Sequence, residues 1–237
     1  MELLRVEVER GVLLSLENRF VARVLLEGEE ECHVPDTGSL MRGLRRGTQV
    51  FVRRRLGLGR RTSCEVVAAA LGEIVGVDSR LPNLLFAELA KRELGGLRGE
   101  VAEEKLVRGA GISYRADFLL LSPGESPIVA EVKGVNYVDE RGIALFPNAR
   151  SERASRQLDE LLRMTREGFR ALVAFIVMRG DAREVRPYYA IDRSFSSRLC
   201  AYRDYIGYKA FMTRFEERNG ALSISYLGEV PLSPCLA

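Results

Sequence analysis

Histidine is almost absent from this 237-residue chain, in which His33 is the single example. A Ser-His-Asp triad or a histidine-based metal cluster would have to use that residue, and no nucleophile-elbow motif accompanies it. The sequence therefore argues against both kinds of site. We interpret His33 as a structural residue on a strand.

The chain also lacks a C-x-x-C pair. Its four cysteines are dispersed along the sequence, at Cys32, Cys64, Cys200 and Cys235. This spacing argues against a zinc knuckle and against a dithiol redox motif. Free buried thiols are the default expectation, and the alternative is a disulfide in a protein from a hot environment.

Long hydrophobic runs are missing as well. The longest, residues 171–178, is too short to cross a bilayer. Residues 1–7 do not show the basic start and apolar core of a signal peptide. With 46% hydrophobic and 29% charged residues, the composition is that of a globular chain. We expect a cytoplasmic protein that does not enter a membrane.

Lysine is scarce, with four residues against 32 arginines, and one of the four ends an apolar stretch. Residues 117–121 begin with Asp117, a turn with two prolines follows, and residues 128–133 contain Glu131 and end in Lys133. Side chains alternate along a strand, so Glu131 and Lys133 project from the same side. A hairpin through the turn would bring Asp117 next to them.

Two carboxylates and an ammonium group in one place can hold a hard divalent cation and a water beside a phosphodiester. This is the D…E-x-K arrangement of many metal-dependent nucleases. The alternative is a structural Glu–Lys pair at a strand end, where a charge is costly unless it is paired or bound.

Short strands dominate the first 78 residues. We expect them at residues 3–9, 12–15, 20–26, 30–34, 49–53, 64–70 and 72–77. Many of these segments alternate or are rich in Val and Leu, and turn signals separate them. So many strands in so short a segment predict a small β-barrel of the OB type over residues 1–78.

One loop of the predicted barrel is rich in arginine. Arginine forks suit phosphates, and OB barrels bind nucleic acid through such loops. We therefore predict a DNA-binding set in this loop and just before it: Arg42, Arg45, Arg46, Arg53, Arg54, Arg55, Arg60 and Arg61. The alternative is a solvated hairpin tip. The formal net charge of +3 is compatible with a nucleic-acid partner.

Residues 79–237 show the pattern of an α/β domain. A helix opens near Ser79 and ends at Gly95-Gly96, with Glu88 on or beside its apolar face. Next come strands at 100–107, 114–121 and 128–133, a helix at 151–168, a strand at 171–178, a helix at 194–208 and a hairpin of strands at 209–216 and 221–227. The order of helix, three strands, helix and strand is α/β and is the core order of the restriction-endonuclease-like fold.

Taken together, the chain resembles the sugar fermentation stimulation protein family over nearly its full length. The matching pieces follow the family's order: residues 33–39 (HVPDTGS), 81–85 (LPNLL) with Glu88, 115–119 (RADFL), 131–133 (EVK), 144–149 (ALFPNA) with Glu152 and Arg153, and Arg179 with Asp181 and Arg183. The departures lie outside the D…E-x-K core: Asp36, Gly134 and Asn148 stand where the family usually has Asn, Ser and Asp, and residues 154–157 (ASRQ) stand where it typically has Gly-Gln-Lys-His.

The resemblance implies an OB-like barrel at residues 1–78 joined to a PD-(D/E)xK nuclease-like α/β domain at residues 79–237. It implies DNA binding of low sequence specificity and a link to the regulation of sugar use. Matched onto this sequence, the catalytic residues are Glu88, Asp117, Glu131 and Lys133, with Asp117 and Glu131 holding Mg²⁺ or Mn²⁺. Arg150 and Arg153 join the expected DNA-binding arginines.

Three functions remain open at this point. The first is a DNA-binding protein whose nuclease-like domain binds without cutting. The second is an active Mg²⁺-dependent nuclease that cuts phosphodiesters at Asp117, Glu131 and Lys133. The third is a small-ligand or protein-interaction module in which the acids are structural, because fold alone does not fix function. A homodimer is also left open.

Overall fold

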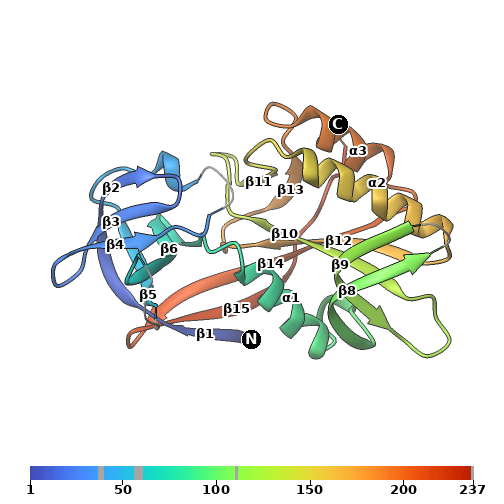
Figure 1. Ribbon diagram of the computed structural model, residues 1–237, viewed down its shortest axis with the longest axis horizontal. Helices are drawn as coiled ribbons and strands as arrows, with labels where there is room; N and C mark the ends of the chain where they lie inside the picture. The colour runs from blue at the N-terminus through green and yellow to red at the C-terminus, as the bar shows by residue number, and fades with distance from the viewer. Residues whose placement is uncertain (37–39, 56–60, 110–111, 236–237) are drawn as a thin grey trace.

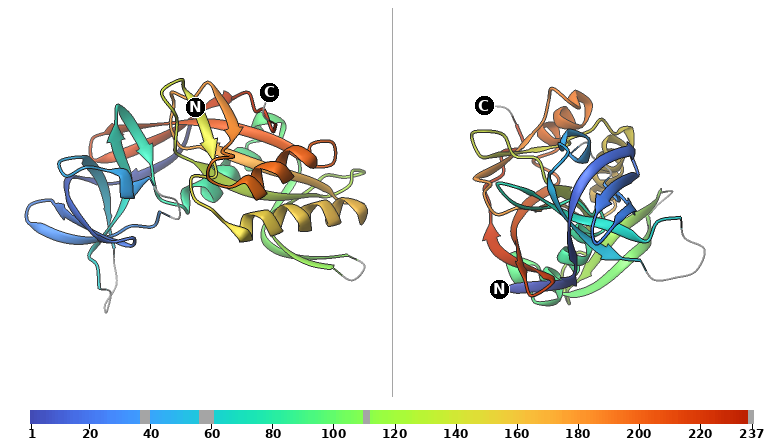
Figure 2. Two further views of the ribbon diagram at one scale, coloured as in Figure 1. Left: turned by 90° about the horizontal axis from the view of Figure 1, so that it is seen from above. Right: turned by 90° about the vertical axis from the view of Figure 1, so that its left-hand side faces the viewer.

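The computed structural model describes residues 1–36, 40–55, 61–109 and 112–235. A small barrel and a larger α/β unit lie side by side along the long axis of the molecule (Figures 1 and 2). Thirteen of the described strands, drawn from both units, belong to one continuous hydrogen-bonded sheet.

Five strands form the barrel: β2 (Glu9–Asn18), β3 (Val21–Leu25), β4 (Glu29–His33), β5 (Gln49–Arg54) and β6 (Cys64–Leu71). The order β2-β3-β4-β6-β5 returns to β2, so the sheet closes, and the β4–β6 pair is parallel. Its interior holds alternate residues such as Leu13, Val24 and Val50. The predicted OB-like barrel is confirmed, and His33 sits on β4 with Nδ1 3.1 Å from the Phe20 carbonyl oxygen.

The first strand, β1 (Glu2–Glu7), lies outside this barrel although the sequence assigns it there. It pairs antiparallel with β15 (Ala221–Glu229), near the other end of the chain. A short strand, β7 (Glu73–Gly76), follows β6 and pairs through Ile74 with Phe215 of β14 (Gly207–Arg218). These pairings join the barrel to the α/β unit.

The α/β unit is built on a mixed sheet. Its remaining elements are α1 (Leu81–Lys91), η2 (Leu94–Gly96), β8 (Glu100–Gly109), β9 (Ile112–Leu121), β10 (Ile128–Val135), β11 (Ile143–Phe146), α2 (Glu152–Arg166), β12 (Arg170–Val177), β13 (Glu184–Pro187) and α3 (Arg193–Ala201). A short 3-10 turn, η1 (Met41–Gly43), belongs to the barrel. Strands β10, β12 and β14 are parallel neighbours, β9 and β8 continue the sheet antiparallel, and β11 pairs with β13 apart from it.

Helices cover both faces of the central strand β12, and residues 171–177 of this strand are accordingly all apolar. Ala174 and Ile176 pack in the cluster that contains α1, whereas Val173, Phe175 and Val177 pack in the cluster that contains α2 and α3. The predicted strand at residues 171–178 is therefore confirmed. Helix α2 begins where expected, because the Ser151 hydroxyl accepts a hydrogen bond from the Ala154 amide.

Two predictions about the second half need correction. The helix expected at residues 194–208 ends at Ala201, and β14 already begins at Gly207. The cysteines are not free thiols: Cys32 is bonded to Cys64 and Cys200 to Cys235. The first bond joins neighbouring barrel strands and the second ties the end of the chain to α3, contacts that sequence spacing does not reveal.

Within the part of the chain that the structure covers, no helix is long and apolar enough to span a membrane.

Candidate active site

The β9–β10 hairpin brings the acidic residues of the D…E-x-K motif together. Ala130 pairs with Phe118 in an antiparallel register, and Asp117 and Glu131 are the next residues on the two strands. The side-chain Oδ2 of Asp117 accepts a hydrogen bond of 2.9 Å from the Val132 amide, between Glu131 and Lys133. The proximity predicted from the sequence is confirmed.

Glu131 is a buried carboxylate with several donors around it. Only 2% of the residue is exposed. The Tyr114 hydroxyl donates to Oε2, and the Gln157 amide of α2 donates to Oε1. Lys133 Nζ lies 2.7 Å from the same Oε1. Because a buried charge is tolerated only when it is paired and hydrogen-bonded, these contacts explain how Glu131 is kept inside the protein.

Lys133 is held between two groups. Its Nζ also donates to Gln157 Oε1 at 2.8 Å, so the α2 side chain contacts both motif residues. The lysine side chain remains 13% exposed, against 3% for that of Glu131. The ammonium group thus has two fixed partners and still reaches solvent.

Asp117 is the acid of the pair that reaches the cavity surface most freely. Burial, and then the negative charge of Glu131, raises the pKa of Asp117 from 3.8 to about 6, against the opposing effects of the Val132 amide, Lys133 and Arg153. Burial of the Tyr114 side chain, followed by the negative charge of Glu131, raises the pKa of Tyr114. Two carboxylates close together repel each other, so a cation bound between them would be stabilised.

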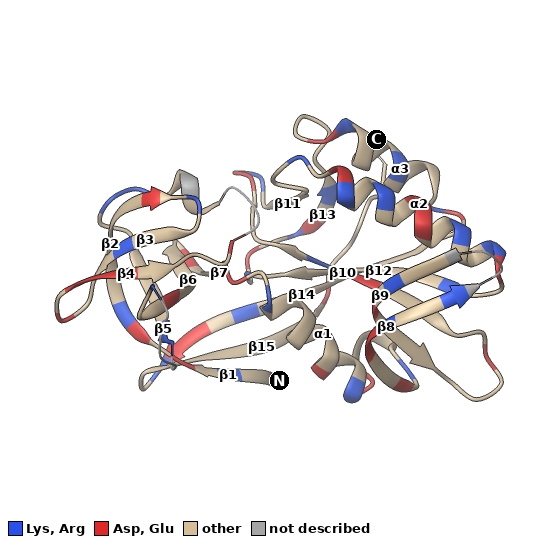
Figure 3. Ribbon diagram, in the orientation of Figure 1, with Lys and Arg blue, Asp and Glu red and all other residues tan. Residues whose placement is uncertain are grey.

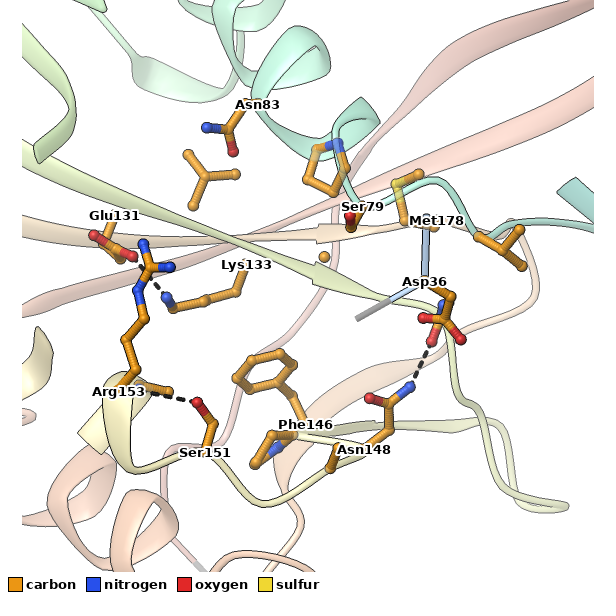
Figure 4. Close-up of a pocket in the computed structure, with 18 of the residues that line it drawn as sticks. Asp36, Ser79, Asn83, Glu131, Lys133, Phe146, Asn148, Ser151, Arg153 and Met178 are labelled. Carbon is orange, nitrogen blue, oxygen red and sulfur yellow. Dashed lines mark hydrogen bonds and ion pairs between the residues drawn. The ribbon is translucent and has the colours of Figure 1, made fainter. Parts of the chain in front are cut away.

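A cavity of about 370 Å³ between the barrel and the α/β unit is lined by Asp117, Glu131, Lys133 and Gln157. Glu131, Lys133 and Arg153 gather at one end, and Asp36 and Asn148 lie at the other, with Phe146 between them (Figure 4). Segments of the barrel contribute Asp36 and residues 76–79, and the approach to α2 contributes residues 146–154. The cavity therefore exists only where the two units meet.

Glu88 does not join this group. It lies on α1 outside the cavity and forms ion pairs with Arg92 at 3.0 Å and Lys91 at 3.7 Å. The α1 residues that line the cavity are Pro82 and Asn83, and Asn83 lies five positions before Glu88. The expectation that Glu88 belongs to the site needs correction: five residues rotate the side chain away and move it more than a turn along the helix.

The predicted DNA-binding arginines divide into two groups. Arg54 binds Glu9 at 2.6 Å and Glu30 at 2.6 Å, Arg53 binds Glu65, and Arg55 donates to Thr62. Acidic and basic positions are interleaved over the barrel (Figure 3). These three arginines are therefore committed to partners within the protein, which weakens the interpretation of the loop as a phosphate-binding surface.

The remaining arginines are placed differently. Arg45, Arg46, Arg61, Arg150 and Arg153 are exposed. Arg150 and Arg153 line the cavity, and the Arg153 guanidinium points toward Glu131 and Lys133 (Figure 4). Arg60 lies outside the described residues, and Arg42 is described by its backbone alone.

Sequence reasoning missed Tyr114 and Gln157. Gln157 could have been found, because it lies on the buried face of α2 with Ala154, Leu158 and Leu161, and a polar side chain among apolar positions needs a partner. Tyr114 gave no such signal, since an aromatic residue on a strand is ordinary.

Comparisons with known proteins agree with this architecture. Residues 14–77 match the family model described as the SfsA N-terminal OB domain, and residues 80–218 match the sugar fermentation stimulation protein RE domain.

Individual relatives match over most of their length. A sugar fermentation stimulation protein homolog from Alkalilimnicola ehrlichii is 38% identical over 201 residues, which cover 82% of this chain and 84% of the relative. A homolog from Citrifermentans bemidjiense is 36% identical over 220 residues, covering 88% and 93%. The structure of Pyrococcus furiosus SfsA in complex with Ca²⁺ matches with a TM-score of 0.84 and 25% identity, over 98% of this chain and 99% of that one.

Proposed function

The chain belongs to the sugar fermentation stimulation protein family, and from this premise we propose that it binds DNA and cleaves its phosphodiester bonds with the help of a divalent metal ion. The observation that carries the proposal is the placement of Asp117 and Glu131 opposite each other beside Lys133, in a cavity that Arg153 also lines. Carboxylates, an ammonium group and a guanidinium are the set that phosphodiester hydrolysis requires.

The acidic pair fits a hard cation. Asp117 and Glu131 supply carboxylate oxygens, which Mg²⁺ and Mn²⁺ prefer, and burial, followed by the negative charge of Glu131, raises the pKa of Asp117. Among the described residues no cluster of three or more His, Cys, Asp or Glu forms, so the pair would share the ion with water and substrate. The related Pyrococcus furiosus SfsA was solved in complex with Ca²⁺, which supports a divalent cation as a ligand here.

When bound, such an ion supplies positive charge that stabilises the negative charge developing on the phosphate. The protein's own groups supply the rest. Lys133, fixed by Glu131 and Gln157, presents an ammonium group that can orient a water molecule and stabilise the same charge. Arg153 can hold a phosphate oxygen at the mouth of the cavity.

The test is a cleavage assay on plasmid and single-stranded DNA with Mg²⁺, with Mn²⁺ and with EDTA. Wild type runs beside Asp117→Asn and Lys133→Met, with Asp204→Asn and Lys105→Met as exposed controls of the same chemistry. We expect metal-dependent cutting that both site variants lose and both controls keep. Cutting that persists in EDTA or in Asp117→Asn would overturn the proposal.

One observation favours a second function, DNA binding without cleavage. Both oxygens of Glu131 already accept hydrogen bonds, from Tyr114, Gln157 and Lys133. A carboxylate that keeps these partners is a poorer metal ligand than an open one. In that case band shifts in the same reactions would appear without cutting, and they would weaken steeply with added salt.

A further inference from the structure

We propose that the cavity holds one unstacked nucleotide, with its phosphate at the Lys133 end and its base at the Asn148 end, so that the substrate is single-stranded DNA or a frayed end. This rests on the proposed function and names the class of substrate for the same site. Four observations carry it: the size of the cavity, its polarity, its aromatic wall and its length along β10.

The size suits a small ligand. About 370 Å³ lies at the lower end of the range of small-molecule pockets, roughly 300–1,000 Å³. The groups proposed to act on the phosphate are recessed, since Glu131 is 2% exposed and the Lys133 side chain 13%. A backbone phosphate reaches them most easily if its nucleotide leaves the stack and enters the cavity.

The two ends differ in charge. Lys133 and Arg153 lie at the end that contains the metal-binding acids. At the far end lie the carboxylate of Asp36 and the amides of Asn136 and Asn148, which are joined by a hydrogen bond of 2.8 Å from Asn148 Nδ2 to Asn136 Oδ1. A phosphate is favoured at the first end and repelled by Asp36 at the second. Carboxamides combine donors and acceptors, as base edges do.

The wall between the ends is aromatic. Phe146 lines the cavity and is only partly buried, and its ring lies between Lys133 and Asn148 in the view of Figure 4. The Phe146 ring packs edge-on against Phe175 and Phe195, with ring centroids 5.5 Å and 5.3 Å apart, and these contacts fix its position. A held aromatic ring beside a phosphate site is how single-stranded DNA is bound without regard to sequence.

The length also fits. Lys133 and Asn136 are three residues apart along β10 and its continuation, a rise of about 10 Å. That span is comparable with the reach of one nucleotide from its phosphate to the far edge of its base. A single ligand can therefore contact both ends at once.

The experiment measures fluorescence anisotropy of a labelled oligothymidylate and of a duplex of equal length, with Ca²⁺ in place of Mg²⁺ to prevent cutting. We expect the single strand to bind at least about 10-fold more tightly, and Phe146→Leu and Asn148→Ala to lose about 10-fold of that affinity, the order expected for one stacked base. The matched control is Phe20→Leu, because Phe20 is an exposed phenylalanine on the barrel, and this variant should keep the affinity for the single strand.

Two outcomes overturn the nucleotide pocket and leave the proposed function intact. One is equal affinity for single strand and duplex with no effect of the cavity variants. The other is loss of single-strand affinity in Phe20→Leu alone, which would move the strand to the barrel.

If neither DNA binds, the proposed function fails. The nucleotide pocket is then tested separately, by saturation-transfer NMR with free thymidine 5′-monophosphate. Transfer to the thymine protons that disappears in Asn148→Ala supports it, and absence of transfer in wild type overturns it. Circular dichroism of each variant checks that the fold is intact.

Discussion

Single residues decide how charge is kept inside this protein. Glu131 is buried beside a second acid, and the groups that make this tolerable come from three elements: Tyr114 from β9, Lys133 from β10 and Gln157 from α2. The motif residues are therefore only part of the site. The donors that surround Glu131 decide both its stability and its availability to a metal.

Tyr114→Phe tests this at one hydroxyl. The substitution removes a donor from a buried carboxylate and leaves the ring in place, so we expect a loss of about 1–3 kcal/mol in the free energy of unfolding. Urea denaturation measures it. The control is Tyr205→Phe, because Tyr205 is 65% exposed and should change stability by less than about 0.5 kcal/mol. Equal effects of the two substitutions would contradict the account of Glu131.

Asp117→Asn should change the pH dependence of stability in metal-free protein. The pKa of Asp117 is about 6 in the folded state against 3.8 ordinarily, so the folded state binds more protons than the unfolded state between these values. Wild type therefore loses stability as the pH rises from about 4 to about 6, and the variant does not. At pH 7.5 in EDTA we expect the variant to be more stable by on the order of 2 kcal/mol.

Thermal melts at pH 4 and pH 7.5 would show this, with near-equal stability at the lower pH. Adding Mg²⁺ at pH 7.5 should raise the melting temperature of wild type and leave the variant unchanged. The same difference in melting temperature between wild type and Asp117→Asn at pH 4 and at pH 7.5 would refute the role of Asp117 in this pH dependence.

At the level of elements, the sequence predicted what local physics controls. Strand periodicity placed β2 to β7, and the cap at Ser151 placed the start of α2. The helix expected at residues 194–208 is too long, because residues 202–206 form turns between the end of α3 at Ala201 and the start of β14 at Gly207. Glu88 was assigned to the site by its match to the family's motif, and only the packing of α1 shows that Asn83 faces the cavity.

One buried carboxylate fixes the starts of two helices. Asp192 accepts hydrogen bonds from the Phe195 amide of α3 at 2.9 Å and from the Ser151 amide before α2 at 3.0 Å, and the residue is 3% exposed. Asp192→Ala should therefore cost about 2–4 kcal/mol, more than the loss of one helix cap. Asp192→Asn keeps one acceptor and should recover part of this. Chemical denaturation of both variants measures the difference, and an alanine effect below about 0.5 kcal/mol would show that the two amides have other partners.

At the level of the whole molecule, one shared sheet joins the two units, and each disulfide ties segments together within one of them. The sequence did not reveal the disulfides, because pairing depends on which strands become neighbours in space. It also missed the β1–β15 pair, which joins residues more than 200 positions apart. Long-range pairings of this kind have no local signature.

Reduction should destabilise the protein measurably. The two bonds span 32 and 35 residues, for which the loss of each corresponds to about 4 kcal/mol. We expect the urea midpoint of wild type to fall in the presence of a reductant. Without reductant, part of that loss should appear in each of two paired variants, Cys32→Ala/Cys64→Ala and Cys200→Ala/Cys235→Ala. A wild-type urea midpoint that is the same with and without reductant would contradict the prediction.

The pairing of β1 with β15 has a consequence for the time at which this protein can fold. On the ribosome, residues 2–7 emerge well before their partner strand at residues 221–229, which is made more than 200 residues later. Local turns and the barrel strands can pair early, but β1 stays exposed until β15 has been made. The pairing that β1 needs is therefore completed only after the strands between them have been translated.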